Sequence, residues 1–213
     1  MDSETKYVLL CNTPSDINEH LPTLYEYSKG CESVLELGVR SGVSTFAFIK
    51  GLSENGSNKR RLVSGDLNEI SSMLNQAQII TFCRDYNIDY TFLKGNDLDI
   101  KIPESVNETD ITFIDTWHIY GHLKRELDKF APITKHYIIM HDTTLDGIYG
   151  ETIRCGWNAE KQSKETGIPV DEINCGLKKA IIEFLEKNKD FSSACHCFLN
   201  SCTPLSVVLL PKE

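Results

Sequence analysis

The sequence predicts an α/β fold, a doubly wound and mostly parallel β-sheet with helices on both faces. Short apolar runs alternate along the first two thirds of the chain with segments whose apolar residues recur at helical spacing. The apolar runs are nearly continuous, which is typical of parallel strands buried on both faces. A length of 213 residues suits one domain, and no linker interrupts the pattern, so we expect a single domain over residues 1–213.

The predicted elements follow one another in regular order. Strands are predicted at residues 33–38, 60–66, 89–95, 110–116 and 136–143. Helices are predicted at residues 16–30, at 41–56 with an end near Gly51, at 69–86, and in a segment with Leu123, Leu127 and Phe130 that Pro132 closes. Four apolar side chains of the 69–86 segment are spaced to form a buried face: Ile70, Met73, Leu74 and Ala77.

The pattern changes after residue 144. Residues 144–174 are polar and lack a clear period, which indicates a long loop or irregular insertion. Long loops in compact domains are commonly lids or binding segments, so residues 145–175 are expected to cover a ligand. A helix at 176–188 and two strand-like runs, at 191–200 and 204–211, close the chain.

The composition excludes several classes of partner. A net charge of −9 argues against nucleic acid and anionic membranes, which favour clustered Lys and Arg. The start "MDSETKYVLL" lacks a signal-peptide pattern, so we expect a cytoplasmic, reducing compartment and eight free cysteines. The group Cys195, His196, Cys197 and Cys202 does not match a common zinc spacing.

The stretch "VLELGVRSGVST", residues 34–45, carries the first functional signal. Gly38 and Gly42 allow the backbone to turn tightly and to approach a ligand. A dinucleotide fingerprint would need glycine where Arg40 stands, and a P-loop would need lysine after Gly42. Both phosphate-binding interpretations therefore fail.

This stretch resembles the first motif of class I S-adenosylmethionine-dependent methyltransferases, E/D-x-G-x-x-x-G. The resemblance continues in order through Asp66 at the end of the second strand, "GNDLD" (95–99) after the third and "FIDTWHIY" (113–120) after the fourth. It implies a Rossmann-like methyltransferase fold with seven strands, the last one antiparallel. It also implies S-adenosylmethionine as the cofactor.

The resemblance assigns each part of this cofactor to residues of the chain. Glu36 suits the positive charge of the cofactor, and Asp66 can accept from both ribose hydroxyls, because an ionised carboxylate is only an acceptor. Asn96 and Asp97 are expected at the adenine. The complete set of expected cofactor residues is Glu36, Gly38, Arg40, Gly42, Ser44, Thr45, Asp66, Asn96, Asp97 and Asp115.

Polar residues after the fourth and fifth strands suggest the chemistry. Methylation of an alcohol needs a general base, or a divalent cation that lowers the pKa of the hydroxyl. "DTWH" supplies Asp115 and His118, and "MHDTT" supplies His141 and Asp142. Adjacent strands lie about 5 Å apart, so Asp115 and Asp142 could share one cation.

This pattern resembles the metal-dependent small-molecule O-methyltransferases related to macrolide-sugar and cephalosporin-type enzymes, and more loosely the catechol type. The resemblance implies His118 as base and a divalent cation, Mg²⁺ or Mn²⁺, at Asp115, His141 and Asp142. His141 departs from the acidic pair of that group, and imidazole suits manganese better than magnesium. The implied acceptor is a hydroxyl of a sugar, a glycan or another small polyol.

Several alternatives remain open at this point. Asp115 could cap the following helix, His118 could bond a loop carbonyl, and His141 could support the ligands by hydrogen bonding. An aromatic acceptor wall is expected from Trp117, Tyr120, Tyr149 and Trp157, although Tyr120 could only pack. The enzyme could instead be metal-independent, using His118 alone, or the domain could bind a cofactor or glycan without turnover. A homo-oligomer is compatible with the sequence.

Overall fold

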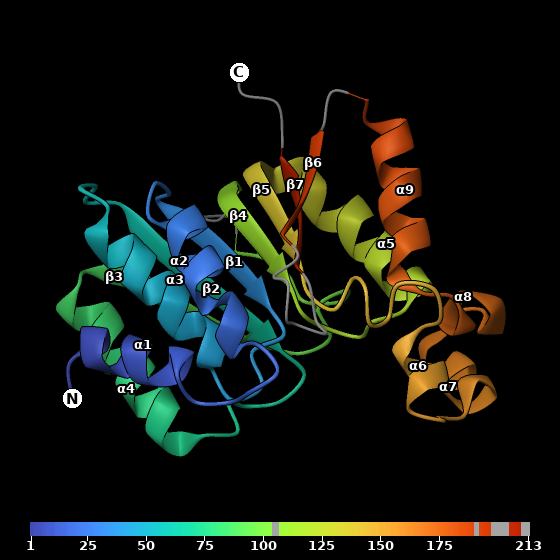
Figure 1. Cartoon of the computed structure of the whole chain (residues 1–213), viewed down its shortest axis with the longest axis horizontal. Helices are drawn as coiled ribbons and strands as arrows, with labels where there is room; N and C mark the ends of the chain where they lie inside the picture. Colours follow the sequence, from blue (N-terminus) through green and yellow to red (C-terminus); the bar gives the residue numbers. More distant parts are fainter. Residues whose placement is uncertain (104–106, 190–191, 197–204, 210–213) are drawn as a thin grey trace. The chain divides into compact units, whose positions relative to one another are not determined.

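The computed structural model describes residues 1–103, 107–189, 192–196 and 205–209, with side chains up to residue 189 (Figure 1). It consists of two compact units, which are described separately. Unit 1 contains residues 1–114 and 133–137, and unit 2 contains residues 115–132 and 138–213. The single domain stays a prediction.

Unit 1 is built on parallel strands. They are β1 (Ser33–Leu37), β2 (Arg60–Asp66), β3 (Ile88–Lys94) and β4 (Thr109–Ile114), followed by β5 (Thr134–Met140), which begins in unit 1. β1 pairs in parallel with β2 and β4, and β2 pairs in parallel with β3. The order is β3-β2-β1-β4-β5, and a Thr112–Thr134 hydroxyl contact of 2.6 Å joins β4 to β5. The five predicted strands are confirmed, with small shifts at their ends.

The strand order reverses between β1 and β4, which are neighbours although β2 and β3 separate them in sequence. In open parallel sheets, ligands bind beyond the carboxyl ends of the strands at such a reversal. The glycine loop after β1 lies at this point of the sheet. The topology therefore places the sequence motif where a cofactor is expected.

The helices of unit 1 differ from the sequence prediction in two respects. They are α1 (Ser3–Cys11), the 3-10 turn η1 (Asn18–His20), α2 (Leu21–Ser28), α3 (Val43–Glu54) and α4 (Met73–Asp85). The sequence prediction missed α1, whose first turn is capped by the Asp2 carboxylate accepting from the Thr5 amide. The predicted face of α4 was also wrong, since Met73 and Leu74 are 85% and 67% exposed.

The buried face of α4 contains a polar residue. The spacing of apolar residues alone therefore did not identify this face. Asn75 is buried together with Ile79, Phe82 and Cys83. The Asn75 amide donates to the Ser41 carbonyl at 2.8 Å, and the Lys6 ammonium donates to the Asn75 side-chain oxygen at 2.7 Å. Burial of a polar side chain costs little when its hydrogen bonds are made, so Asn75 can lie inside.

The glycine loop that precedes α3 has a left-handed backbone. Gly38 and Gly42 have φ values of 86° and 77°, and Gly42 is the residue at the amino-terminal cap of α3. A Cβ atom on Gly42 would lie 2.8 Å from the Ile79 Cδ1 atom. Both the φ angle and the neighbour therefore require glycine at position 42.

Unit 2 contains α5 (Tyr120–Phe130), α6 (Glu151–Arg154), α7 (Ala159–Thr166), α8 (Val170–Asn174) and α9 (Leu177–Lys187), and the 3-10 turn η3 (Ala131–Ile133) begins in it. β6 (Ser192–His196) and β7 (Leu205–Leu209) form an antiparallel pair in this unit. The prediction of a seven-stranded sheet with an antiparallel last strand stays a prediction. Leu177, Ala180 and Phe184 form the buried face of α9, in agreement with its periodicity.

The expected irregular insertion at 144–174 is instead organised as three short helices, α6, α7 and α8 (Figure 1). Helices of four to eight residues are too short to show a readable apolar period, and α7 buries none of its residues. The segment is anchored by Ile168 and Ile173, which pack against Ile119. Its role as a lid stays a prediction.

Two smaller sequence predictions concern membranes and cysteines. No helix in the described part of the chain is long and apolar enough to cross a membrane. The five cysteines with described side chains are free thiols: Cys11, Cys31, Cys83, Cys155 and Cys175. The side chains of Cys195 and His196, and all of Cys197 and Cys202, lie outside the described residues.

We expect Gly42→Ala to destabilise the protein by about 1–3 kcal/mol, because it forces a side chain into a left-handed backbone against Ile79. Urea unfolding measures the change. Gly56→Ala is the matched control, since nothing lies within 4 Å of its added Cβ. Equal stabilities of the two variants would contradict the described loop.

Candidate active site

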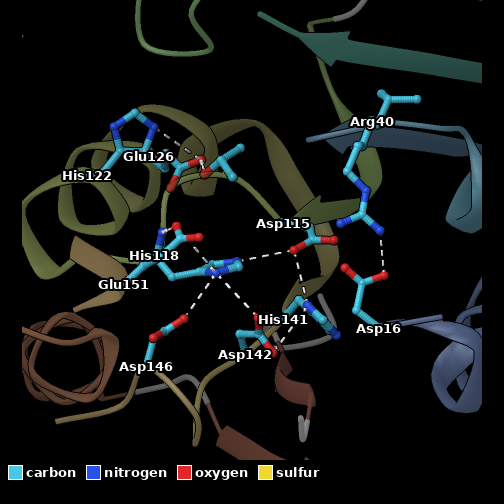
Figure 2. Close-up of polar contacts among 12 residues, drawn as sticks. Asp16, Arg40, Asp115, His118, His122, Glu126, His141, Asp142, Asp146 and Glu151 are labelled. Carbon is cyan, nitrogen blue, oxygen red and sulfur yellow. Dashed lines mark hydrogen bonds and ion pairs between the residues drawn. The ribbon is translucent and has the colours of Figure 1, made fainter. Parts of the chain in front are cut away.

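The polar residues after β4 and β5 meet in unit 2 (Figure 2). Asp115 directly follows β4, and its Oδ1 atom lies 3.1 Å from His118 Nε2 and 3.1 Å from His141 Nδ1. His141 directly follows β5 and is 1% exposed. The sequence prediction that these residues converge is therefore supported by their geometry.

The other nitrogen of His118 faces further carboxylates. His118 Nδ1 lies 3.3 Å from Asp146 Oδ2, 3.4 Å from Asp142 Oδ2 and 4.0 Å from Glu151 Oε2. The His118 side chain is only 12% exposed. One nearly buried imidazole is thus surrounded by four acidic side chains (Figure 2).

This environment shifts the pKa values of the cluster. Burial lowers the pKa of His118, but the hydrogen bond to Asp115, the close contact with Asp146 and the nearby negative charges raise it well above its usual value. Burial raises the pKa of Asp115, but His141 and His118 bring it well below its usual range. Burial raises the pKa of Asp142. The carboxylates therefore favour the protonated, cationic form of His118.

Two alternatives from the sequence are excluded by these contacts. Asp115 does not cap α5, because Ile119 occupies the cap position and no side chain bonds there. His118 directs both ring nitrogens at carboxylates rather than at a loop carbonyl. Asp115 and His118 are instead members of one charged cluster.

Metal-ligand groupings in the cluster differ from the predicted trio of Asp115, His141 and Asp142. His141 Nδ1 lies 3.1 Å from Asp115 Oδ1 and 3.6 Å from Asp142 Oδ1, so the trio is connected through His141. Among the described residues of unit 2, two sets of possible ligand atoms lie within 4.8 Å of one another: Asp115 with His118 and His141, and His118 with Asp142 and Asp146. Both sets include His118, so a ligand role of this ring would compete with its predicted role as base.

Two residues of this cluster, Asp146 and Glu151, were not predicted from the sequence. Asp146 is fully buried, and Arg154 donates to both of its oxygens at 2.6 and 2.9 Å. The Glu151 amide donates to the His118 carbonyl at 2.8 Å. Both residues lie in the 144–174 segment, where apolar residues have no regular spacing. No sequence pattern therefore indicated their roles.

The predicted cofactor residues other than Asp115 lie in unit 1, where Glu36 is fully buried. It is 0% exposed and accepts from the hydroxyls of Ser44, Thr45 and Ser64 at 2.6, 2.9 and 2.7 Å. These bonds fasten the start of α3 and strand β2 to β1. Glu36 therefore stabilises the glycine loop. Its contact with the positive charge of the cofactor stays a prediction.

Asp66 also supports the glycine loop. Its Oδ2 atom accepts the amides of Val39 and Arg40 at 2.9 and 2.8 Å, and its Oδ1 atom accepts the amide of Asn68 at 2.9 Å. A carboxylate offers about four lone-pair sites, so only part of its acceptor capacity remains for a ribose. The Arg40 guanidinium pairs with Asp16 at 2.6 Å (Figure 2).

Asn96 and Asp97 lie one residue beyond β3, after Gly95, as predicted. The Asn96 side-chain oxygen accepts the Leu98 amide at 3.0 Å, and its carbonyl accepts the Ile100 amide at 2.8 Å. Asp97 is 8% exposed. The turn is therefore fixed by its own hydrogen bonds, and the adenine contact stays a prediction.

The expected aromatic wall is only partly supported. Tyr120 is buried and donates to Glu183 of α9 at 2.8 Å. This agrees with the alternative that Tyr120 only packs. Trp117 packs against the cluster that contains Ile119 and Ile168. Tyr149 and Trp157 are 67% and 48% exposed. Two aromatic side chains therefore remain available to a ligand.

Residues 35–143 match the model of a family described as a methyltransferase domain. This chain belongs to that methyltransferase family. The match includes the glycine loop, Asp66, Asp115, His118, His141 and Asp142. None of the curated proteins is significantly similar in sequence.

Solved structures share the fold of this methyltransferase at low sequence identity. The O-methyltransferase TomG from Streptomyces achromogenes, involved in tomaymycin synthesis and solved with SAM, is 12% identical, with a TM-score of 0.59 over 99% of this chain and 90% of TomG. An O-methyltransferase from Bacillus cereus in complex with SAH is 15% identical, with a TM-score of 0.58 over 98% and 91%. An SAH-bound methyltransferase from Podospora anserina is 14% identical, with a TM-score of 0.54 over 100% and 89%.

Proposed function

We propose that this methyltransferase transfers a methyl group from S-adenosylmethionine to a hydroxyl of a sugar or another small polyol. The observation that carries the proposal is the position of His118 between Asp115 on one ring nitrogen and Asp142 and Asp146 on the other. The cofactor is supported by the E-x-G-x-x-x-G loop and by fold neighbours that were solved with SAM or SAH. We keep the expectation of a cytoplasmic location.

The chemistry requires one proton acceptor. The acceptor oxygen forms a bond to the methyl carbon while the bond from that carbon to sulfur breaks, and the hydroxyl proton leaves to a base. His118 is proposed as this base in its neutral form, which is populated only at higher pH because the pKa of the ring is raised. Asp115, whose pKa is held low, remains ionised to stabilise the imidazolium that forms.

The cluster also fits a divalent cation. Asp142 Oδ1 is buried and makes no hydrogen bond to the described residues, and His141 Nδ1 lies 3.6 Å from it. Asp115, His141 and Asp142 would hold the ion, and their mixed oxygen and nitrogen donors favour Mn²⁺ over Mg²⁺. Such an ion lowers the pKa of a hydroxyl and stabilises the oxyanion.

The proposed acceptor site lies beside the 145–175 segment. The Glu151 amide donates a hydrogen bond to the His118 carbonyl, which links the segment to the proposed base. Exposed Tyr149 and Trp157 offer faces on which the C–H groups of a sugar ring could stack. A metal-independent enzyme and a binding module without turnover are the alternatives that the following measurements separate.

We expect S-adenosylhomocysteine to raise the melting temperature, because binding to the native state stabilises it by about 2.7 kcal/mol at a hundredfold excess over Kd. NAD is the control and should cause no shift. Asp66→Ala should lose most of the shift and also lower the basal stability, since it releases the amides of Val39 and Arg40. An unmoved melt at millimolar S-adenosylhomocysteine would overturn the cofactor assignment.

We expect His118→Ala to lower kcat by about a hundredfold or more while the affinity for S-adenosylhomocysteine stays near wild type. Transfer of labelled methyl groups to a panel of sugars and polyols measures the activity. His136→Ala is the control, because its side chain is 47% exposed in unit 1. Wild-type turnover in His118→Ala would remove this residue from the mechanism, and methyl transfer to no acceptor would favour a binding module.

We expect EDTA to abolish activity and Mn²⁺ or Mg²⁺ to restore it. Asp142→Ala should reproduce the effect of EDTA without unfolding the protein, because it removes a carboxylate of the proposed cation site. Electron paramagnetic resonance of added Mn²⁺ detects binding independently of turnover. Full activity in EDTA would identify the metal-independent alternative.

A further inference from the structure

Two of the three buried residues of helix α1 are polar. The buried residues are Ser3, Lys6 and Leu10, while Val8 and Leu9 are each 47% exposed. A helix that buries little apolar surface gains little free energy from packing alone. The contacts of its polar side chains therefore determine how α1 is attached to unit 1.

Lys6 is the buried cation of this helix. The residue is 7% exposed, and its ammonium donates to the Asn75 side-chain oxygen at 2.7 Å and lies 5.0 Å from the centre of the Phe46 ring. Burial lowers the pKa of Lys6, because an ammonium loses its solvation inside the protein. A buried ammonium is costly unless it forms hydrogen bonds, so the contact with Asn75 is strongly favoured.

Asn75 connects Lys6 to the glycine loop. An ammonium can only donate, so the Asn75 oxygen faces Lys6, and the Asn75 nitrogen donates to the Ser41 carbonyl at 2.8 Å. Ile79 lies one turn further along α4 and reaches the next loop residue, since a Cβ atom on Gly42 would lie 2.8 Å from its Cδ1 atom. One face of α4 therefore contacts two successive residues of the loop.

These contacts fix the peptide between Ser41 and Gly42. Its carbonyl accepts from Asn75, and its amide, on Gly42, donates to the Val39 carbonyl at 2.8 Å. Gly42 is also the amino-terminal cap residue of α3, where no side chain caps the helix. The first amides of a helix are oriented donors that suit a carboxylate, such as that of the cofactor's amino-acid end. The orientation of this peptide therefore sets the direction of the first donors of α3.

We propose that Asn75, oriented by Lys6, is a positioning residue that holds the Ser41–Gly42 peptide in the orientation that binds S-adenosylmethionine. Helix α1 then contributes to cofactor affinity through the glycine loop. This inference rests on the proposed function, in particular on its cofactor. Cofactor binding and the contact between Lys6 and Asn75 stabilise each other, because coupling between two sites is reciprocal.

The first test measures the Kd of S-adenosylhomocysteine by isothermal titration calorimetry. Lys6→Met keeps an unbranched side chain of similar length but removes the ammonium. We expect it to raise Kd about tenfold, within the usual range of coupling between separate sites. The free energy of unfolding, measured in urea, shows how much stability the same variant loses.

A second variant, Asn75→Asp, separates positioning of the loop from attachment of α1. The new carboxylate still accepts from Lys6, now as an ion pair, but it cannot donate to the Ser41 carbonyl. We expect Kd to rise at least as much as in Lys6→Met. A role in attaching α1 alone predicts the opposite result, because the ion pair keeps α1 in place.

The matched control is Ser3→Ala. Ser3 is 5% exposed and its hydroxyl lies 2.5 Å from the Tyr86 hydroxyl, so this variant also removes a buried polar contact of α1. Tyr86 follows the carboxyl end of α4, whereas Asn75 lies in its first turn, so Kd should stay near wild type. A wild-type Kd in Asn75→Asp, or equal rises in Ser3→Ala and Lys6→Met, would overturn the positioning role and leave the proposed function intact. A wild-type protein that does not bind S-adenosylhomocysteine would refute the proposed cofactor, and this inference with it.

The second test requires neither ligand nor activity. Hydrogen exchange of the ligand-free protein, followed by NMR, reports how firmly each backbone amide is held. We expect the Gly42 amide, which donates to the Val39 carbonyl, to exchange about tenfold faster in Lys6→Met than in the wild type, while the amides of β1 keep their protection. Unchanged exchange at Gly42 would overturn the inference. Faster exchange in β1 as well would identify a general loss of stability and would overturn it too.

Discussion

The attraction between one imidazole and its surrounding carboxylates is the interaction on which the candidate site depends. Acidic side chains at such short separations would repel one another and would each resist burial. The His118 ring lies between Asp115 on one side and Asp142 and Asp146 on the other, and Arg154 compensates the most buried of them. The site can therefore hold several carboxylates close together although they are largely shielded from water.

Unit 1 also contains a buried acidic side chain, and neutral hydrogen-bond donors stabilise it. Glu36 is as buried as Asp146, and it accepts hydrogen bonds from hydroxyls of α3 and β2. Hydrogen bonds to the charged form compensate for the lost water and also tie together the elements that shape the glycine loop. One buried acid thus stabilises the glycine loop, and another stabilises the surroundings of His118.

The sequence predicted the parts of the molecule that depend on local pattern. The parallel strands, the glycine loop and the meeting of Asp115 with His118 and His141 follow from apolar runs and from residues at strand ends. The buried face of α4 was missed because Asn75 is satisfied by Lys6 and Ser41, which are remote in sequence. Asp146 was missed because its partners are known only after α6 has formed.

The hydrogen bond between α6 and His118 restricts the first part of the 145–175 segment. The second part of the segment tolerates changes in sequence and length more easily. Up to Arg154, a single inserted or deleted residue would move Glu151 or Arg154 off its partner. Helix α7 buries none of its residues, so its length and surface are less constrained. The second part of the segment can accordingly change in length and sequence at little cost, whereas a change in the first part would disturb the surroundings of His118.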